Sequence, residues 1–549
     1  MPLQKNQILP LRIERLSSDG SGVAHSADGE AVFVPGTAPG DEARVHIVKD
    51  CGRYAFGILD ELLTPSPDRV PVDCLVAGPC GGCSLRHLDY AAELRAKQES
   101  VLDAFRRIGG LEVPVLDIQP SPEVDRYRNK VQFPVGVDKN GVPCIGFYAG
   151  RTHRIVPCPD CKLQPGVLNE IGNALCAFFA QQGIRPYDEQ SGKGLVRHIF
   201  LRRGAHSGQI MVCLVCTRAK LPHAEQLCTA LRGQFPAIST ILLNVNAKST
   251  NVILGSENHI LYGPGYIEDT LCGVPVRLGP LSFYQVNTLA AERLYGVAAQ
   301  YAQLTPDDTL LDLYCGMGTI GLSMAEQCRE LIGVEIVPEA IESAKANAAR
   351  MGEAVAAKSR FFCADAGQAA TQLAAEGLHP DIVMLDPPRK GCDEATLSAV
   401  VRMAPRRVVY VSCNPATAAR DAAWLEQNGY HAEKVQPVDL FPRTKHCETV
   451  VLLSKGEVDS KKIRVEFSLE DMDMSEFQDG ATYTQIKDYV LEHSGLKVSN
   501  LYISQIKRKC GIEVGKNYNL PKSEDSRQPM CPPEKEKAIR EAFKYFGMI

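Results

Sequence analysis

The feature that most constrains this sequence is a series of short apolar segments, each ending in a polar residue, between residues 309 and 415. The segments are rich in β-branched and aromatic residues, and helix-length stretches separate them, so we predict buried strands alternating with helices. They cover residues 309–313, 331–334, 381–385 and 408–411. This alternation predicts a doubly wound, mainly parallel sheet with right-handed crossovers, and such sheets bind ligands at the carboxyl ends of their strands.

The first strand leads into Gly316-x-Gly318-x-x-Gly321, and the second strand ends at Glu335. This spacing matches a dinucleotide-binding loop, in which glycines let the backbone approach the ligand and the acid binds ribose hydroxyls. S-adenosylmethionine uses the same type of loop. Asp312, at the entry to the loop, would repel a pyrophosphate. A sulfonium with a free amino group would instead attract the carboxylates at or near the strand ends, which are Asp312, Glu335, Asp365 and Asp386. The sequence therefore favours S-adenosylmethionine over a nicotinamide cofactor, and a loop that only packs is the third alternative.

The last strand ends abruptly in Ser412-Cys413-Asn414-Pro415, because proline cannot continue a strand ladder and pushes the preceding residue out of the helical region. This places one thiol at the ligand-binding edge of the sheet. A thiolate attacks carbon well, so Cys413 is a candidate nucleophile. A single cysteine is more often a small buried hydrophobe, so the assignment depends on the surrounding residues.

Composition indicates a globular chain of several domains, with 549 residues, 45% hydrophobic and 23% charged. The net charge of −5 gives no overall basic field, so any nucleic-acid site must be a local patch. No apolar run approaches the roughly 18 residues of a membrane helix, and the first residues have no signal-peptide core. We therefore expect a soluble cytoplasmic protein with no membrane partner, whose 20 cysteines are reduced.

Four further regions surround the sheet of residues 286–454. Residues 1–60 are predicted to form a five-stranded OB-like barrel, which either binds RNA on one face or is purely structural. Residues 90–285 are predicted to form a central α/β domain, in which Arg126-Tyr-Arg-Asn-Lys130 either contacts phosphate and stacks on a base or is a solvated charged face. Residues 455–549 are predicted to be a small, mostly helical accessory domain. Its expected parts are an exposed strand at 461–469, an acidic run at 470–473 and helices at 484–494, 499–509 and 534–546.

The fourth region, residues 61–89, contains Cys74, Cys80 and Cys83, the last two separated by two glycines. Thiolates at this spacing share one metal centre, and three are one short of the set for zinc or an iron–sulfur cluster. The fourth is expected from Cys158-Pro-Asp-Cys161. Three unconnected buried thiols are the alternative, but glycine-rich polar surroundings do not favour it.

The joint set of motifs resembles the RNA uracil-C5 methyltransferases over about residues 8–453. The set comprises Phe283-Tyr-Gln285-Val-Asn287, Asp312-Leu-Tyr-Cys-Gly-Met-Gly-Thr319, Asp386-Pro-Pro-Arg-Lys-Gly391, Ser412-Cys-Asn-Pro415 and His446-Cys-Glu-Thr449. Within the family, the chain most resembles the 23S ribosomal RNA branch, which has a leading TRAM barrel and an iron–sulfur cluster. Gly20-Ser-Gly-Val-Ala24 and Val32-Phe-Val-Pro-Gly36 resemble that barrel.

The resemblance implies a role for each candidate residue. Gln285, Tyr314, Glu335 and Asp386 would bind S-adenosylmethionine, Cys413 would be the nucleophile, and Glu448 the base. Cys74, Cys80, Cys83 and Cys161 would hold a [4Fe–4S] cluster, with Cys161 preferred to Cys158 because it fits the family's spacing.

The implied reaction is methylation at C5 of a uridine, most simply in a 23S ribosomal RNA loop from which the base is flipped, with no obligate protein partner. Transfer RNA as substrate, cytosine-C5 methylation and amino methylation are the enzymatic alternatives. A non-catalytic RNA-binding assembly factor is the alternative from another class.

Overall fold

The computed structural model describes residues 3–150, 152–248, 250–456, 483–494, 496, 498–510 and 531–545. The chain divides into two compact units, Met1–Val458 and Asp459–Ile549. The strand expected at 461–469 and the acidic run at 470–473 lie outside the described residues. Among the described helices, none has the length and apolar character needed to cross a bilayer.

The chain begins with a small all-β domain of six strands in the order β1-β5-β6-β4-β3-β2. Alternate side chains are buried, among them Val32, Val45 and Ile47, which gives the domain its own core. Five strands were predicted, and the sixth arises because residues 8–16 break at Ile13: the first part pairs with β5 and the second with β3. The strands are β1 (Ile8–Arg12), β2 (Arg15–Leu16), β3 (Gly22–His25), β4 (Ala31–Val34), β5 (Glu42–Asp50) and β6 (Tyr54–Thr64).

The central region is a mixed seven-stranded sheet in the order β13-β12-β11-β10-β7-β8-β9. Its middle strands β10 and β11 are almost entirely buried, including Cys213 and Cys216, which are core residues as the apolar pattern of this strand predicts. Helix α3 (Gly166–Gln181) and helix α4 (Ala224–Gln234) contribute apolar side chains to the same core. The strands are β7 (Lys130–Val137), β8 (Pro143–Tyr148), β9 (Ile155–Pro157), β10 (Val196–Arg203), β11 (Ile210–Cys216), β12 (Ile238–Val245) and β13 (Glu257–Tyr262). A hairpin of β14 (Ile267–Leu271) and β15 (Val274–Leu278) follows.

The third region is a second seven-stranded sheet in the order β18-β17-β16-β19-β20-β22-β21. Its first five strands in this order pair in parallel, and β22 pairs antiparallel with both β20 and β21. The chain moves outward from β16 through β17 to β18 and then crosses to β19 on the other side of β16, so the switch point lies between β16 and β19. The strands are β16 (Thr309–Leu313), β17 (Glu330–Glu335), β18 (Ser359–Cys363), β19 (Ile382–Leu385), β20 (Arg407–Ser412), β21 (Tyr430–Val438) and β22 (Glu448–Lys455).

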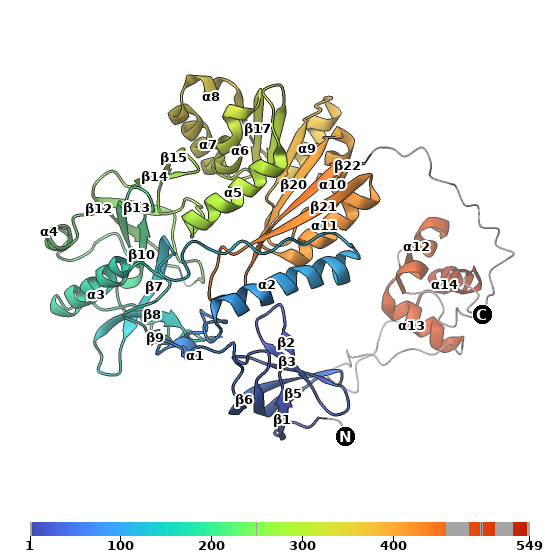
Figure 1. The fold of residues 1–549 in the computed structure, drawn as a ribbon, viewed down its shortest axis with the longest axis horizontal. Coiled ribbons are helices and arrows are strands. Elements are labelled where there is room, and N and C mark those ends of the chain that lie inside the picture. The colour runs from blue at the N-terminus through green and yellow to red at the C-terminus, as the bar shows by residue number, and fades with distance from the viewer. Residues whose placement is uncertain are drawn as a thin grey trace. The chain divides into compact units, whose positions relative to one another are not determined.

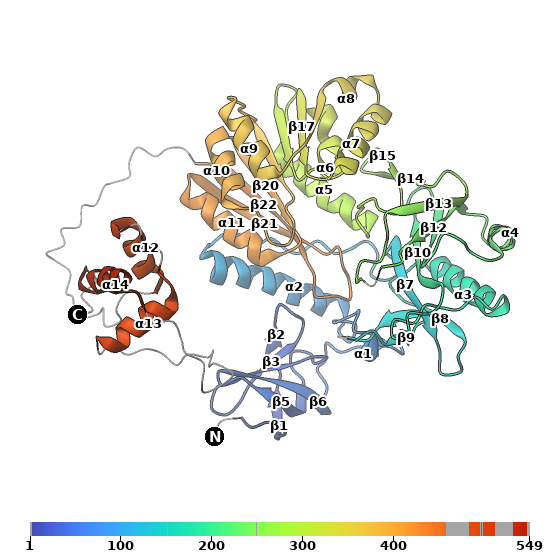
Figure 2. The same cartoon turned by 180° about the vertical axis from the view of Figure 1, so that it is seen from behind.

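Both faces of this sheet are covered, which explains why its strands are continuously apolar in sequence. Successive residues such as Leu310 and Leu311, or Val408 and Val409, belong to two different cores. One core includes α5 (Thr288–Ala302), α6 (Thr319–Met324) and α7 (Pro338–Met351). The other includes α9 (Ala366–Ala375), α10 (Glu394–Met403), α11 (Pro415–Gln427) and α2 (Tyr90–Ala104), and Figures 1 and 2 show the two sets of helices on opposite sides of the sheet.

The second unit contains helices α12 (Tyr483–Ser494), α13 (Asn500–Lys509) and α14 (Pro533–Tyr545), close to the expected helices. A small apolar core, including Ile486, Ile503, Ile539 and Phe543, joins the three helices. The side chain of Ser499 accepts a hydrogen bond from the Tyr502 N–H at the start of α13.

Candidate active site

A cavity of about 970 Å³ opens at the carboxyl ends of the parallel strands, next to the switch point. Six residues expected to bind cofactor or substrate come from separate strand ends and loops, and all six line this one cavity: Gln285, Tyr314, Glu335, Asp386, Cys413 and Glu448. The sheet brings four of them together, because Tyr314, Glu335, Asp386 and Cys413 stand at the carboxyl ends of parallel strands, which meet at the same edge. Glu448 reaches this edge at the start of the antiparallel strand β22, and Gln285 from the segment before α5.

The loop after β16 makes a tight turn against Glu335. Tyr314, Gly316 and Gly318 have positive φ values of 68°, 55° and 80°. The Gly316 N–H donates to Glu335 Oε2 (3.1 Å), and the Val337 N–H donates to Glu335 Oε1 (3.0 Å). A Cβ at Gly316 would meet no other atom within 4 Å, so the backbone there faces open space in the cavity. This arrangement suits a ligand that lies against the loop and reaches the carboxylate.

Asp312 has a structural role, although the sequence predicts that its charge faces the ligand. It is buried, and it is absent from the residues that line the cavity. Its Oδ2 accepts the Gly321 N–H (3.0 Å), and a Cβ at Gly321 would lie 2.8 Å from the same oxygen. Burial also raises the pKa of Asp312 to about 8. Through its contact with Gly321, this carboxyl supports the glycine loop from inside the protein. Asp365 and Asp386, by contrast, do line the cavity.

Cys413 stands at the junction of β20 and α11 and is partly exposed. Asn414 fixes this junction: its Oδ1 accepts the Ala416 N–H (3.1 Å), and its Nδ2 donates to the carbonyl of Arg389 (3.0 Å). The second contact ties the loop after Asp386 to the strand end that carries the thiol. Burial raises the pKa of Cys413, and the charge of Glu448 raises it further, whereas the Arg389 guanidinium lowers it through charge and a hydrogen bond.

Glu448 is the first residue of β22, and the strand register puts it beside the thiol. Ser412 is paired with Thr449 in the antiparallel ladder, so the next step of the ladder sets Cys413 opposite Glu448. Burial raises the pKa of Glu448 to about 8, Asp386 raises it further, and Arg389 opposes both effects. Burial also raises the pKa of Asp386 to about 7. A carboxyl with its pKa near neutrality, next to a thiol, is equipped to remove a proton.

Tyr295 and Phe441 also line the cavity, and no sequence motif contains either of them. Lys130, from the run expected to contact RNA, and His446, from the last motif, line it as well. The rings of Phe441 and His446 meet edge to face, with centroids 6.1 Å apart. Burial lowers the pKa of Lys130 to about 8. No short sequence pattern identifies Phe441 or His446 as neighbours, because the contact depends on the path of the loop between β21 and β22.

The charged run before β7 differs from its expected role. Tyr127 is buried and donates its hydroxyl hydrogen to the Pro442 carbonyl (3.0 Å), so it does not stack on a base. Arg126 forms an ion pair with Asp160 (2.7 Å) and donates to the Cys161 carbonyl (2.9 Å). Asn129 is buried against Gln285. The run mainly joins the central region to the cavity wall, and Lys130 reaches the cavity.

Four cysteines were expected to bind a cluster: Cys74, Cys80, Cys83 and Cys161. They lie close enough to influence one another electrostatically, and Cys158 shares a hydrogen bond with Cys161. In the part of the chain that the structure describes, no group of three or more His, Cys, Asp or Glu side chains has the arrangement that holds a metal ion. Among the described residues, these thiols thus lie in one region without the arrangement of a metal site.

The small β domain has an exposed aromatic patch on β4 and β6, formed by Phe33, Tyr54 and Phe56. Their ring centroids lie 5.6–5.9 Å apart, and Tyr54 and Phe56 are 42% and 37% exposed. The Phe33–Phe56 pairing of the parallel strands brings these rings to one face. Exposed aromatic rings on a small barrel offer a platform on which nucleic-acid bases stack.

Comparison with known families agrees with this geometry. Residues 89–456 match the family model described as tRNA (Uracil-5-)-methyltransferase, and residues 2–59 match the TRAM domain. An uncharacterized RNA methyltransferase of Halalkalibacterium halodurans is 42% identical over 455 residues, which cover 82% of this chain and 98% of that protein. One of Clostridium tetani is 40% identical over 454 residues, covering 83% and 98%.

A solved structure extends the likeness to the fold. The Pyrococcus abyssi tRNA (uracil-54, C5)-methyltransferase in complex with S-adenosyl-L-homocysteine is 27% identical, with a TM-score of 0.65. The match covers 81% of this chain and 100% of that one. The donor is therefore S-adenosylmethionine and the target atom uracil C5, which sets aside the nicotinamide, cytosine, amino-methylation and non-catalytic alternatives. The cavity, its thiol and its carboxylates, together with these matches, show that the chain belongs to the tRNA (uracil-5-)-methyltransferase family and is an S-adenosylmethionine-dependent RNA (uracil-5-)-methyltransferase with a TRAM domain.

Proposed function

We propose that this enzyme methylates a uridine of 23S ribosomal RNA through a temporary bond between Cys413 and uracil C6, with Glu448 as the base. The observation that carries the catalytic part is that Cys413 and Glu448, the residues next to the last pair of the β20–β22 ladder, line one cavity with Asp386, and the charge of Glu448 acts on the thiol. The choice of ribosomal RNA rests on the grouped cysteines beside the TRAM domain, which resemble the 23S branch.

The residues that line the cavity fit S-adenosylmethionine. Glu335 would take the ribose hydroxyls, Tyr314 would pack beside the loop, and Gln285 and Asp386 would face the charged end of the donor. When bound, S-adenosylmethionine supplies an electrophilic methyl group attached to a sulfonium. The open face of the loop at Gly316 leaves room for this ligand.

The chemistry then follows from the thiol and the carboxylate. The Cys413 thiolate adds to C6, and the electron pair of the C5–C6 bond moves toward C5 and O4, which makes C5 nucleophilic. C5 would then form a bond to the methyl carbon of the donor, while the methyl–sulfur bond breaks and its electron pair stays on sulfur, so that a neutral thioether leaves. Glu448 removes the C5 proton, the electrons of that C–H bond restore the C5–C6 double bond, and the C6–S bond breaks to return the thiolate. The target base must be unstacked for both faces to be reached, so a flipped nucleotide is expected.

An RNA carrying 5-fluorouridine tests this assignment, because fluorine at C5 cannot leave as a proton and the adduct persists. We expect the RNA to become covalently bound to Cys413, and the bound RNA to be methylated only when S-adenosylmethionine is present. Cys413→Ala should form no covalent complex. Full turnover by Cys413→Ala would refute the role of this thiol. Incubation of 23S fragments and transfer RNA transcripts side by side tests the substrate, and methylation of transfer RNA alone would refute the ribosomal proposal.

We also propose that Cys74, Cys80, Cys83 and Cys161 hold a [4Fe–4S] cluster. The donor set fits, since four thiols from two segments converge and thiolates are the usual ligands of such clusters. Methyl transfer involves no redox step, so the cluster would have a structural role. It would join the 74–83 segment to the central region. Protein purified without oxygen should contain iron, and Cys83→Ser should lose it, whereas the matched variant Cys158→Ser should retain it. The absence of iron from the wild-type protein would refute the cluster.

A further inference from the structure

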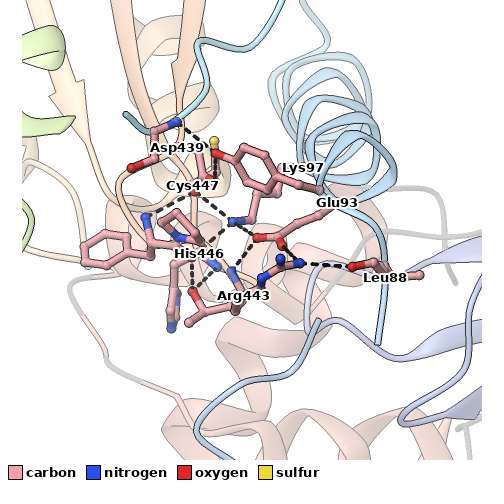
Figure 3. Close-up of polar contacts among 12 residues, drawn as sticks. Leu88, Glu93, Lys97, Asp439, Arg443, His446 and Cys447 are labelled. Carbon is pink, nitrogen blue, oxygen red and sulfur yellow. Dashed lines mark hydrogen bonds and ion pairs between the residues drawn. The ribbon is translucent and has the colours of Figure 1, made fainter. Parts of the chain in front are cut away.

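Lys97 is a fully enclosed cation that lies apart from the cavity. It belongs to α2 and is 3% exposed. Its ammonium group donates to Glu93 Oε1 (2.7 Å), Asp439 Oδ1 (2.8 Å) and the carbonyl of Phe441 (3.1 Å), as Figure 3 shows for the two carboxylates. All three N–H groups of the ammonium are therefore used, and two of the three acceptors lie more than 340 positions away in the sequence.

The charges around Lys97 balance. Glu93 and Asp439 are fully buried carboxylates, and the Arg443 guanidinium lies 3.7 Å from Glu93 Oε2. Two cations thus face two anions (Figure 3). Burial alone would lower the pKa of Lys97, but Asp439 and Glu93 outweigh it and hold that pKa above its usual value, so Lys97 is charged. Taking such charges out of water contributes little net stability, so the network calls for another explanation.

The network holds the loop that leads into Glu448, the first residue of β22. Residues 439–447 connect β21 to β22, and Val438 is paired with Glu448 where the loop closes. The four carbonyls at the start of the loop, Leu440 to Arg443, each accept a hydrogen bond from a distant part of the chain. The donors, in order, are Asn287 Nδ2 (3.0 Å), Lys97 Nζ (3.1 Å), the Tyr127 hydroxyl (3.0 Å) and the Leu85 N–H (3.1 Å).

Lys97 is the charged member of this set of donors and acts on the loop at two points, the Asp439 side chain and the Phe441 carbonyl. Glu93 adds a third point, because it accepts the Arg443 N–H (2.7 Å) at a residue with a φ of 68°. The loop brings Phe441 and His446 to the cavity and ends at Glu448. Movement of the loop would therefore displace the base, while Cys413 follows the central strand β20 and is held by the side-chain contacts of Asn414.

We propose that Lys97 is a positioning residue, which through Glu93 and Asp439 fixes the 439–447 loop and so holds Glu448 in place for removal of the C5 proton. The proposal rests on the function assigned above to Glu448. It predicts a selective defect: addition of the thiol and methyl transfer persist when Lys97 is lost, and the later loss of the C5 proton is slowed.

Single-turnover reactions of Lys97→Met with RNA containing [5-³H]uridine separate these steps. Incorporation of labelled methyl into all RNA, free or protein-bound, reports methyl transfer, and tritium release into water reports loss of the C5 proton. We expect methyl transfer within about 3-fold of wild type and tritium release slowed about 10- to 100-fold, the effect of a base displaced by up to about 1 Å. A methylated RNA–protein adduct should accumulate. Equal loss of both steps, or no loss of either, would overturn the proposal.

Two further variants control for folding. Arg69→Met removes the cation from another buried carboxylate, Asp41 (2.7 Å), within the N-terminal region. It should lower the melting temperature without changing the ratio of the two rates. The double variant Lys97→Met, Asp439→Asn removes one cation and one anion and leaves Glu93 paired with Arg443, so the buried charges stay balanced. If Lys97→Met does not fold, the ratio of the two rates in this double variant decides the question. The rates of methyl incorporation and tritium release can be measured whichever residue forms the adduct. A wild-type enzyme that forms no adduct on Cys413 would therefore refute the proposed function, while the Lys97 test would still apply.

Discussion

Arg389 should set the pH at which the enzyme works, because its charge favours the ionised forms of both Cys413 and Glu448. A cation close to an acid lowers its pKa by about 1–3 units, and Arg389 is exposed to solvent, so the lower end applies. Replacing Arg389 with Gln should therefore raise the pKa of both groups by about 1 unit, which corresponds to about 1.4 kcal/mol for each.

The sign of the effect follows from the two protonation states. Addition to C6 needs the Cys413 thiolate, and removal of the C5 proton needs the Glu448 carboxylate. Activity therefore falls as the pH drops below the pKa values of these two groups. With the pKa of Glu448 at about 8, it is about one-tenth ionised at pH 7, and a rise of about 1 unit leaves about one-hundredth. Proton removal by Arg389→Gln should thus be about 10-fold slower at pH 7 and should approach the wild-type rate near pH 10.

The assay is the pH dependence of kcat/KM, which reports the pKa values of the free enzyme. Lys390→Gln is the matched control, since Lys390 is on the same loop and lines the same cavity but is not among the charges that shift either pKa. The control should keep the wild-type profile. If Arg389→Gln lowers activity by the same factor at every pH, Arg389 acts on RNA binding or loop shape, and the electrostatic reasoning is refuted.

Three other outcomes follow from the site. Glu448→Gln should trap the methylated adduct and slow turnover by about 10²- to 10⁴-fold, as measured by denaturing electrophoresis and tritium release; normal turnover would exclude Glu448 as the base. Glu335→Ala should weaken S-adenosylmethionine binding about 10- to 100-fold in calorimetry, because hydrogen bonds to a charged group are lost, while RNA affinity stays constant. The double variant Tyr54→Ala, Phe56→Ala should weaken RNA binding by about 1–3 kcal/mol for each base that stacks, with kcat at saturating RNA unchanged; unaltered RNA affinity would show that the patch is not a contact surface.

The sequence determined the doubly wound sheet and much of its ligand-binding edge. Continuous apolar strands that alternate with helices leave few arrangements, and the carboxyl ends of parallel strands must meet. The sequence therefore predicts that Glu335, Asp386 and Cys413 lie together. The barrel was predicted as well, although not the break at Ile13, because a change of pairing partner at a corner depends on two distant strands.

Which charged and aromatic residues near the site face the ligand depends on how distant parts of the chain pack together. Tyr127 belongs to a run typical of RNA contact, yet it is buried against the loop that carries Glu448. Asp312 occupies a strand-end position and braces the glycine loop instead of lining the cavity. Lys97 lies in an unremarkable helical segment, and its partner Asp439 is 342 positions away. Local patterns determine periodicity and chain direction, whereas pairing between buried charges so far apart depends on how complete domains pack, and no short stretch of sequence contains that information.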